Sequence, residues 1–219
     1  MFKDFKAGVF DWNETILDAP EIEFELVREI LKGFGITTLD KKTYFQNRWL
    51  GWFEILHLFG VPRTVPGSEL IVLREMNLKG KVGRAELREG VSLLLDSLKH
   101  RQIKMEIVSS EATRVIESGV IDSGLSRYFH VLQGDAFDEV HYESELRKAV
   151  TRIGLRPADC FYLGGTLPGL TAAKNVGLHP FALCKQKNGE EILTSASPEK
   201  LFRSLLAFYA ALIPQASTR

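Results

Sequence analysis

The chain has 219 residues, about one and a half times the length of a typical single domain, which suits one large domain or a core with an insert. Hydrophobic residues make up 45% of it and charged residues 26%, as in ordinary globular proteins. Its 28 basic residues balance 28 acidic ones, so charge gives no reason to expect a nucleic acid or a membrane as partner. The composition therefore argues against a polyanion as partner.

Cysteine content and the amino terminus indicate a compartment. Cys160 and Cys184 lie in apolar runs without Cys-x-x-Cys spacing, so we expect two buried thiols rather than a disulfide or a zinc site. The first residues are charged where a secretory signal needs an apolar run, and no apolar stretch reaches membrane-spanning length. The sequence predicts a cytoplasmic location.

The first half of the chain is predicted to be one strand followed by helices. Residues 6–10 form an apolar run too short for a helix, and we predict a strand there. Apolar residues recur every three or four positions between 20 and 34, as in an amphipathic helix. A second helix is predicted from about 40 to 59, and a third from about 68 to 78, stopping at Gly80.

No strand is evident between about 20 and 85, and this predicts a helical insert in an otherwise mixed fold. We expect residues 19–85 to form a helical cap, and residues 1–18 and 86–219 to form the core domain. Further strands are predicted at 103–108, 129–133, 160–163 and 179–184, separated by helices at 91–99, 112–117, 143–153 and 168–176, with a last helix opening at 197. The predicted fold class is α/β, a Rossmann-like three-layer core with a parallel five-stranded sheet plus the inserted cap.

Polar or glycine residues follow three of the predicted strands. Asp11, Ser109 and the pair Gly164-Gly165 each stand at the carboxyl end of a strand, where open parallel sheets bind ligands. Asp11 should be ionised at neutral pH unless its surroundings are unusually apolar, because a free aspartate has a pKa near 3.9. It could serve as a nucleophile or as a cap of the following turn.

At this point the chain resembles the haloacid dehalogenase superfamily. The first motif of this superfamily ends a strand with Asp-x-Asp-Gly-Thr, and in a group of phosphatases it reads Asp-x-Asn-Gly-Thr-Leu. Residues 11–18 of this chain, Asp-Trp-Asn-Glu-Thr-Ile-Leu-Asp, look like the second version. Residues 108–110, Val-Ser-Ser, look like the second motif, and residues 159–164 lead into the fourth. The helical insert lies where this family places its cap, so the resemblance covers nearly the whole chain.

The resemblance implies a phosphatase resembling phosphoglycolate phosphatase, which works through a phosphoaspartyl intermediate. Asp11 would attack phosphorus, and Asn13 stands where the family protonates the leaving group and activates water. Ser109 would hold a phosphoryl oxygen, with Ser110 and Thr15 as further substrate-binding residues. Mg²⁺, bound by Asp11 and the backbone carbonyl of Asn13, is the implied cofactor, and the implied partner is a small phosphorylated metabolite or another small anion.

The first motif and the third depart from the family pattern. Asn13 has no acidic proton to transfer. Glu14 replaces a glycine, and its side chain either places a negative charge beside the phosphate or points to solvent. The family's lysine before the fourth motif is not found at 141–143, and His141, Lys148 or Asp135 would have to substitute for a missing residue, although each is more typical of a surface position.

The fourth motif departs furthest. Gly165 stands where the family has a magnesium-binding acid, and Gly169 stands where it has a supporting acid. We therefore expect little or no phosphatase activity. The alternatives are a non-catalytic ligand-binding or regulatory module on the same scaffold, and metal-free attack of Asp11 on a carbon–halogen bond.

Aromatic residues of the insert leave a further choice open. Tyr44, Phe45, Trp49, Trp52 and Phe53 cover more than one helical face, so we expect some in the cap core, while others could line the cleft or meet the second subunit of a homodimer. Three arginines of the insert, Arg48, Arg63 and Arg74, are expected to be solvated, with contact to an anionic substrate as the alternative.

Overall fold

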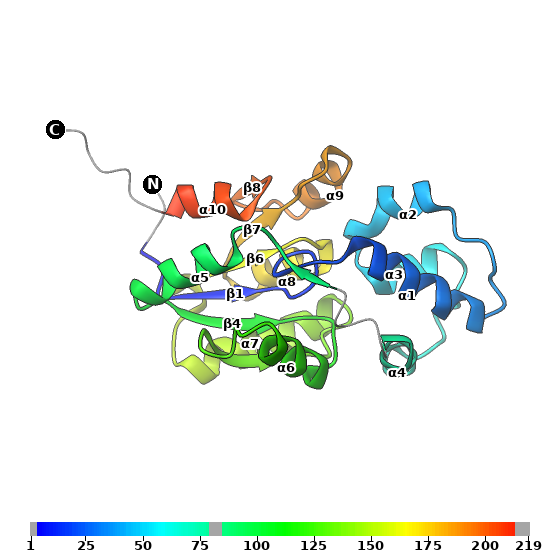
Figure 1. Ribbon diagram of the computed structural model, residues 1–219, viewed down its shortest axis with the longest axis horizontal. Helices are drawn as coiled ribbons and strands as arrows, with labels where there is room; N and C mark the ends of the chain where they lie inside the picture. Colours follow the sequence, from blue (N-terminus) through cyan, green and yellow to red (C-terminus); the bar gives the residue numbers. More distant parts are fainter. Residues whose placement is uncertain (1–3, 79–84, 213–219) are drawn as a thin grey trace.

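A computed structural model describes residues 4–78 and 85–212. Its main sheet has six parallel strands in the order β5-β4-β1-β6-β7-β8 (Figure 1). The strands are β1 (Ala7–Phe10), β4 (Lys104–Val108), β5 (Phe129–Gln133), β6 (Cys160–Gly164), β7 (His179–Leu183) and β8 (Lys200–Phe202). The five predicted strands are all present, and the sheet gains a sixth.

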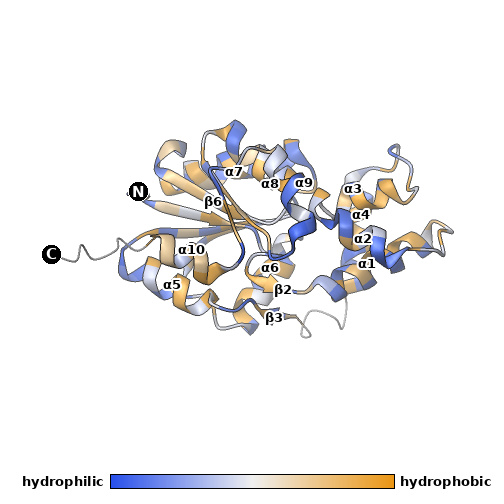
Figure 2. Ribbon diagram, turned by 90° about the horizontal axis from the view of Figure 1, so that it is seen from above, coloured by the Kyte–Doolittle hydropathy of each residue, from blue (hydrophilic) through white to orange (hydrophobic). Residues whose placement is uncertain are grey.

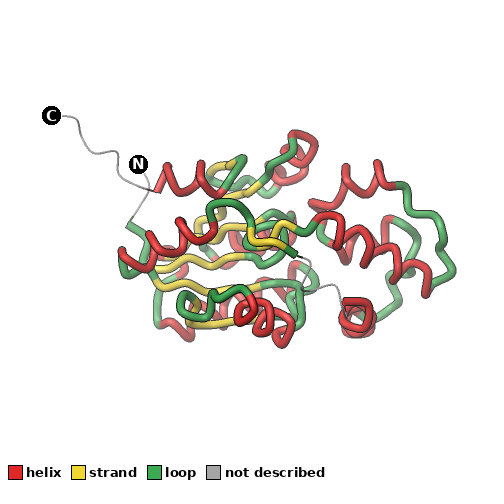
Figure 3. The backbone as a smooth tube through the Cα atoms, viewed as in Figure 1, coloured by secondary structure: helices red, strands yellow, loops and turns green. Residues whose placement is uncertain are grey.

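Helices cover both faces of this sheet, so the core has three layers (Figure 3). One face packs against α5 (Val91–His100), α6 (Thr113–Asp122) and α10 (Leu205–Leu212), and the other against α7 (Glu139–Ile153), α8 (Leu167–Val176) and α9 (Glu190–Ser195). Successive residues of a strand point to opposite faces. In β6, accordingly, Phe161 and Leu163 join the first cluster, while Cys160 and Tyr162 join the second.

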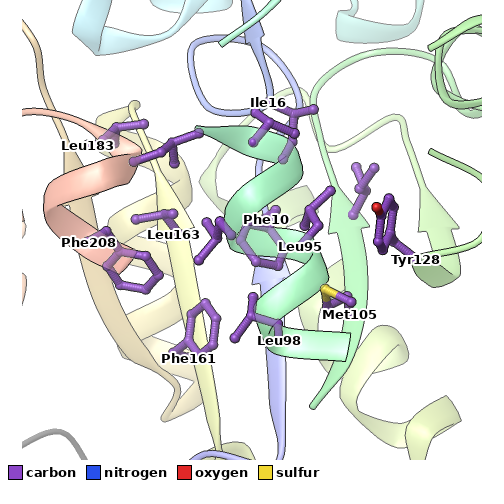
Figure 4. Packing of buried hydrophobic residues seen from close by; sticks show 14 of the residues in the cluster. Phe10, Ile16, Leu95, Leu98, Met105, Tyr128, Phe161, Leu163, Leu183 and Phe208 are labelled. Carbon is purple, nitrogen blue, oxygen red and sulfur yellow. The ribbon is translucent and has the colours of Figure 1, made fainter. Parts of the chain in front are cut away.

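Aromatic and aliphatic side chains fill the first face closely (Figure 4). Phe10 of β1 packs edge-on against Phe161 of β6, with ring centroids 5.6 Å apart, and Phe161 packs against Phe208 of α10 at 5.4 Å. Leu95 and Leu98 of α5 cover the same rings. This packing fixes β1 at the centre of the sheet and so fixes the position of Asp11 after it.

Four helices lie together at one end of the core, beyond the sheet (Figures 1 and 2). They are α1 (Pro20–Gly33), α2 (Lys41–Asn47), α3 (Trp52–Leu58) and α4 (Gly67–Leu78), with a short 3₁₀ turn, η1 (Arg48–Leu50), between α2 and α3. We call α1–α4 the cap helices. Each shows hydrophilic and hydrophobic residues side by side in Figure 2, and their buried residues form a cluster of their own.

A small antiparallel ribbon joins the two ends of this helical segment. Its strands are β2 (Leu17–Asp18) and β3 (Glu86–Leu87), with Leu17 opposite Leu87 and Asp18 opposite Glu86. The ribbon was not predicted, and it lies at the boundaries that the sequence suggested for the cap. The division into a core of 1–18 and 86–219 and a cap of 19–85 stays a prediction, and the expected helix stop at Gly80 lies outside the described residues.

Two predictions of secondary structure were wrong. The single helix expected from 40 to 59 is broken at Gly51, whose φ of 87° is a conformation that side chains with a Cβ avoid. Gly51 also approaches α8 closely, since a Cβ there would lie 3.2 Å from Pro168 Cγ. The helix expected from 197 begins only at Leu205, because residues 200–202 pair with β7 as the edge strand.

Candidate functional site

Three strand ends meet at the edge of the sheet that faces the cap helices. Central strand β1 pairs with β4 on one side and β6 on the other, so that Phe10 lies opposite both Ile107 and Leu163. Asp11 and Ser109 follow directly after these strands, and the backbone N–H of Asp11 donates to the Leu163 carbonyl at 3.0 Å. These strands are therefore neighbours, and their ends bring Asp11 and Ser109 together.

Asp11 is a buried acid surrounded by neutral donors. Only 2% of its surface is exposed. Its Oδ1 accepts hydrogen bonds from the Trp12 N–H at 2.8 Å and the Tyr142 hydroxyl at 3.3 Å, and its Oδ2 accepts one from the Thr166 hydroxyl at 3.5 Å. Burial raises the pKa of Asp11 from 3.8 to about 7, although these bonds and one with Ser109 lower it. The expected ionisation of Asp11 depended on surroundings that are not unusually apolar, and this condition is not met, because desolvation outweighs the hydrogen bonds.

Tyr142 stands in the stretch where the family's lysine was sought. Asp138 caps the amino terminus of α7 by accepting from the His141 N–H, so the helix starts at Glu139, four residues earlier than predicted. This start brings Tyr142 into the core with 1% of its surface exposed and its hydroxyl beside Asp11. A neutral hydroxyl thus occupies a place where a cation was expected.

The other proposed substitutes lie away from Asp11. His141 Nδ1 lies 2.7 Å from Asp138 Oδ1, and Lys148 pairs with Glu145 at 2.6 Å. Asp135 is exposed in a turn with a φ of 63°. Within residues 4–78 and 85–212, Asp11 forms no ion pair with a lysine, arginine or histidine.

Side chains from other positions fill the space beside the two glycines of the fourth motif. A Cβ at residue 169 would overlap the hydroxyl of Tyr162, which is itself buried without a hydrogen-bond partner among the described residues. A Cβ at residue 165 would lie 3.2 Å from the Cβ of Glu14 and 3.3 Å from the Leu183 carbonyl. An acid at either position would require its neighbours to move. Tyr162 and Glu14 thus occupy space that an acid at residue 169 or 165 would need.

Glu14 is largely buried, with 11% of its side chain exposed, and is paired rather than solvated. Its φ of 60° lies in the left-handed region, which accounts for glycine at this position in the family. Its side chain lies 3.0 Å from Arg48 Nη1 and 3.4 Å from Arg88 Nη2. Burial raises its pKa, although both arginines lower it. The Arg48 side chain is 7% exposed, so the expectation of a solvated arginine is wrong here because Glu14 neutralises it.

A second buried ion group joins the cap helices to the core. Arg74 of α4, 1% exposed, donates from Nε to Glu111 of the loop after β4 at 2.6 Å and from Nη2 to Glu23 of α1 at 2.7 Å. Asn13 Nδ2 donates to the same Glu111 at 2.8 Å, and the Arg74 guanidinium lies 5.0 Å from the Trp52 ring centroid. The expectation of a solvated arginine is therefore wrong for Arg74 as well. It is confirmed for Arg63, which forms an exposed pair with Glu54.

A cavity of about 530 Å³ lies between the cap helices and the strand ends. Asp11, Asn13 and Ser110 line it, together with Thr166. Most of its exposed wall is apolar, from aromatic and aliphatic side chains. Tyr44, Trp52 and Phe53 line the cavity and also pack in the cluster of the cap helices, as does Phe45, whereas Trp49 packs in the cluster of α7 and α8 rather than in the cap core.

Two of the sequence-predicted site residues lie off this cavity. Ser109 is fully buried behind Asp11, and its Oγ accepts from the Glu111 N–H at 3.3 Å. Thr15 is also fully buried, and its hydroxyl has no hydrogen-bond partner among the described residues. The catalytic role of Asp11, Asn13 and Ser109, and the substrate-binding role of Ser109, Ser110 and Thr15, stay predictions.

The residues around Asp11 do not fit a magnesium ion. Magnesium is normally held by carboxylates, waters and substrate oxygens in octahedral geometry. Here Glu14 already pairs with two arginines, and Tyr162 fills the space of an acid at residue 169. Across the described ranges, no three acidic, histidine or cysteine side chains gather in a way that could hold a metal. The set of Asp11 and the Asn13 carbonyl is too small for a dedicated site.

Fold and site together place this chain in a known family. The model of haloacid dehalogenase-like hydrolases matches residues 9–183, and the chain belongs to this family as a phosphatase-like member. A phosphoglycolate phosphatase of Synechococcus elongatus is 26% identical over 201 residues, covering 91% of this chain and 93% of that one.

Solved structures agree with this assignment of fold. A haloacid dehalogenase-like hydrolase of Streptococcus pneumoniae, 17% identical, superposes with a TM-score of 0.81 over 97% of this chain and all of that one. CbbY of Rhodobacter sphaeroides, a mutant in complex with xylulose-(1,5)bisphosphate, gives 0.73 at 19% identity over 97% of this chain and 98% of that one. None of the described helices is long and apolar enough to cross a bilayer.

Proposed function

We propose that this protein binds a small molecule in the cavity under its cap helices and does not turn over phosphate monoesters as a magnesium-dependent phosphatase does. The observation that carries this proposal is the set of side chains around Asp11. Hydroxyls of Tyr142 and Thr166 stand beside it, and Tyr162 fills the space of a fourth-motif acid.

Phosphoryl transfer to Asp11 would face an electrostatic barrier in this site. An anionic carboxylate must approach an anionic phosphate, so catalysis depends on cations and donors that stabilise the developing charge. The one cationic side chain among the described lining residues, Arg48, is paired with Glu14. Burial also keeps part of the Asp11 population protonated near pH 7 and therefore not nucleophilic.

Proton transfer is weakened as well. Asn13 can orient a leaving group or a water molecule, but its amide cannot act as general acid or base, a function usually worth about 10² to 10⁴ in rate. Its Nδ2 is moreover directed to Glu111. Together, the chain's own residues support binding in the cavity better than hydrolysis.

The second candidate function is a phosphatase activity toward a small phosphorylated metabolite, which the names of the relatives suggest. One observation favours it. Arg48 lines the cavity, and its Nε forms no hydrogen bond with any described residue, so an anion could accept from it.

A phosphate-release assay decides between the two. The purified chain is incubated with Mg²⁺ and a panel of small phosphate monoesters, beside an Asp11→Asn variant that keeps the size of the side chain. We expect the same background rate from both proteins. Turnover well above background that disappears in Asp11→Asn would establish the phosphatase and refute our proposal.

A further inference from the structure

The charged side chains that line the cavity are almost all acidic. Six of them are carboxylates and one is a guanidinium. The carboxylates are Asp11, Glu14, Glu23, Glu54, Asp138 and Glu139. No lysine or histidine is found among the described lining residues. An anionic ligand would therefore enter a region whose formal charge already has its own sign.

Most of these carboxylates have an ion-pair partner, and two do not. Glu14 pairs with Arg48, Glu23 with Arg74 and Glu54 with Arg63, and Asp138 contacts His141 Nδ1 at 2.7 Å, a pair that is ionic only when the imidazole is protonated. Within the described ranges, neither Asp11 nor Glu139 forms an ion pair. Asp11 is buried and Glu139 is exposed, and among the described residues Glu139 accepts from the Asn175 amide alone, at 3.1 Å.

Aromatic rings form much of the remaining wall. Tyr44, Trp52 and Phe53 come from the cap side, and Phe137 and Tyr142 come from the core side. The faces of such rings attract cations, and cages of aromatic residues with a carboxylate suit amines and quaternary ammonium groups. The rings also provide apolar area for the body of a ligand.

We infer that the cavity binds a small organic cation with an apolar body, an amine or a quaternary ammonium compound, with Asp11 and Glu139 as its counter-charges. This inference rests on the proposed function, because it requires that the cavity does not bind and hydrolyse phosphate esters. The cavity volume of about 530 Å³ accommodates a molecule of this size.

Calorimetric titration with three probes of one shape tests the charge preference. Benzyltrimethylammonium, benzyl alcohol and phenyl phosphate share a phenyl ring and are cationic, neutral and anionic. We expect the full chain, without added metal, to bind benzyltrimethylammonium about 10-fold more tightly than benzyl alcohol, with no measurable binding of phenyl phosphate.

Variants locate the binding. Asp11→Asn should weaken the cation about 10-fold and Glu139→Gln about 2-fold to 3-fold, because each removes one counter-charge. Glu143→Gln is the matched control: Glu143 lies one turn further along α7 and accepts from the same Asn175 amide at 2.8 Å, but it does not line the cavity. It should leave the cation's Kd unchanged. Circular dichroism checks that Asp11→Asn is folded, and the exposed Glu139 provides a second test.

Several results would overturn the inference. These are equal or tighter binding of benzyl alcohol or phenyl phosphate, no binding of the cation to the folded chain, or equal weakening by Glu139→Gln and Glu143→Gln. Tight binding of phenyl phosphate would show that the cavity prefers an anion instead. Release of phosphate from phenyl phosphate with Mg²⁺ tests the proposed function separately, since that function survives a failure of cation binding.

Discussion

Two buried groups of polar side chains lie between the cap helices and the sheet, one around Arg74 and one around Asp11. Arg74 is held between Glu111 and Glu23, and their charge raises its pKa above the ordinary arginine value despite its burial. Asp11 has only neutral donors beside it, and burial raises its pKa to about 7. The carboxylates of the first group face a cation within the protein, whereas Asp11 forms no ion pair with any described residue.

This difference separates a structural contact from a binding site. The Arg74 group joins α1, α4 and the loop after β4, so it holds the cap helices against the core at a fixed position. Asp11 lines the cavity that this arrangement leaves open. A buried charge without a partner is costly to the fold, and proteins retain such groups most often at functional sites.

Removing the charge of Arg74 should have the largest effect. Arg74→Met leaves Glu111 and Glu23 buried without their cation, and we expect a loss of about 3 to 5 kcal/mol in the free energy of unfolding. Urea denaturation followed by circular dichroism measures it. Arg63→Met removes an exposed pair with Glu54 and should cost less than about 1 kcal/mol. Equal costs for the two variants would mean that the Arg74 group does not hold the cap.

Glu106 extends the comparison to an acid that forms no ion pair with a described residue and does not line the cavity under the cap helices. It is fully buried in β4, neither carboxyl oxygen has a hydrogen-bond partner among the described residues, and burial raises its pKa from 4.5 to about 8. Between pH 4.5 and 8 the folded state keeps a proton that the unfolded chain releases, so this group reduces stability as pH rises. Glu106→Gln should therefore stabilise the protein more at pH 8 than at pH 5. We expect its effect on the free energy of unfolding to be about 2 to 3 kcal/mol larger at pH 8.

Urea denaturation at both pH values checks this, with Glu117→Gln on the exposed side of α6 as the control. The control should change stability equally at pH 5 and pH 8. A Glu106→Gln variant without this pH-dependent gain would show that the carboxyl is ionised and solvated in the folded protein.

The sheet and the position of Asp11 could be predicted because they depend on local patterns. Short apolar runs ending in polar residues or glycine located five strands, and the order of the motifs gave the family. Edge strand β8 was missed because its three residues, Lys-Leu-Phe, have no strand pattern of their own and are ordered by pairing with β7. The break at Gly51 likewise depends on the close approach of α8.

The side chains around Asp11 could not be predicted, because they come from distant parts of the chain. Tyr142 and Thr166 stand 131 and 155 residues away, and the Arg48 pair with Glu14 joins the cap to the first motif. A helical pattern does not show that an arginine is buried when its partner is on another element. Tyr162 had one usable signal: a large aromatic residue precedes two glycines in a motif where acids are expected.

The smallest expected effect tests why Asp11 lacks acidic neighbours. Gly169 lies in α8, where alanine is normally preferred to glycine by roughly 0.5 to 1 kcal/mol. A Cβ at this position would overlap the Tyr162 hydroxyl, so Gly169→Ala should instead destabilise the protein by about 1 to 2 kcal/mol. Gly33→Ala in α1, where a Cβ meets nothing within 4 Å, is the control and should be neutral or stabilising.

Combining Gly169→Ala with Tyr162→Phe should recover part of the loss, because the closest overlap is with the hydroxyl oxygen. Urea denaturation of the two single variants and the double variant gives the interaction energy between the two positions. If Gly169→Ala costs as much with phenylalanine at 162 as with tyrosine, the hydroxyl does not exclude a side chain at 169. The missing acid would then need another explanation than the space that Tyr162 occupies beside Asp11.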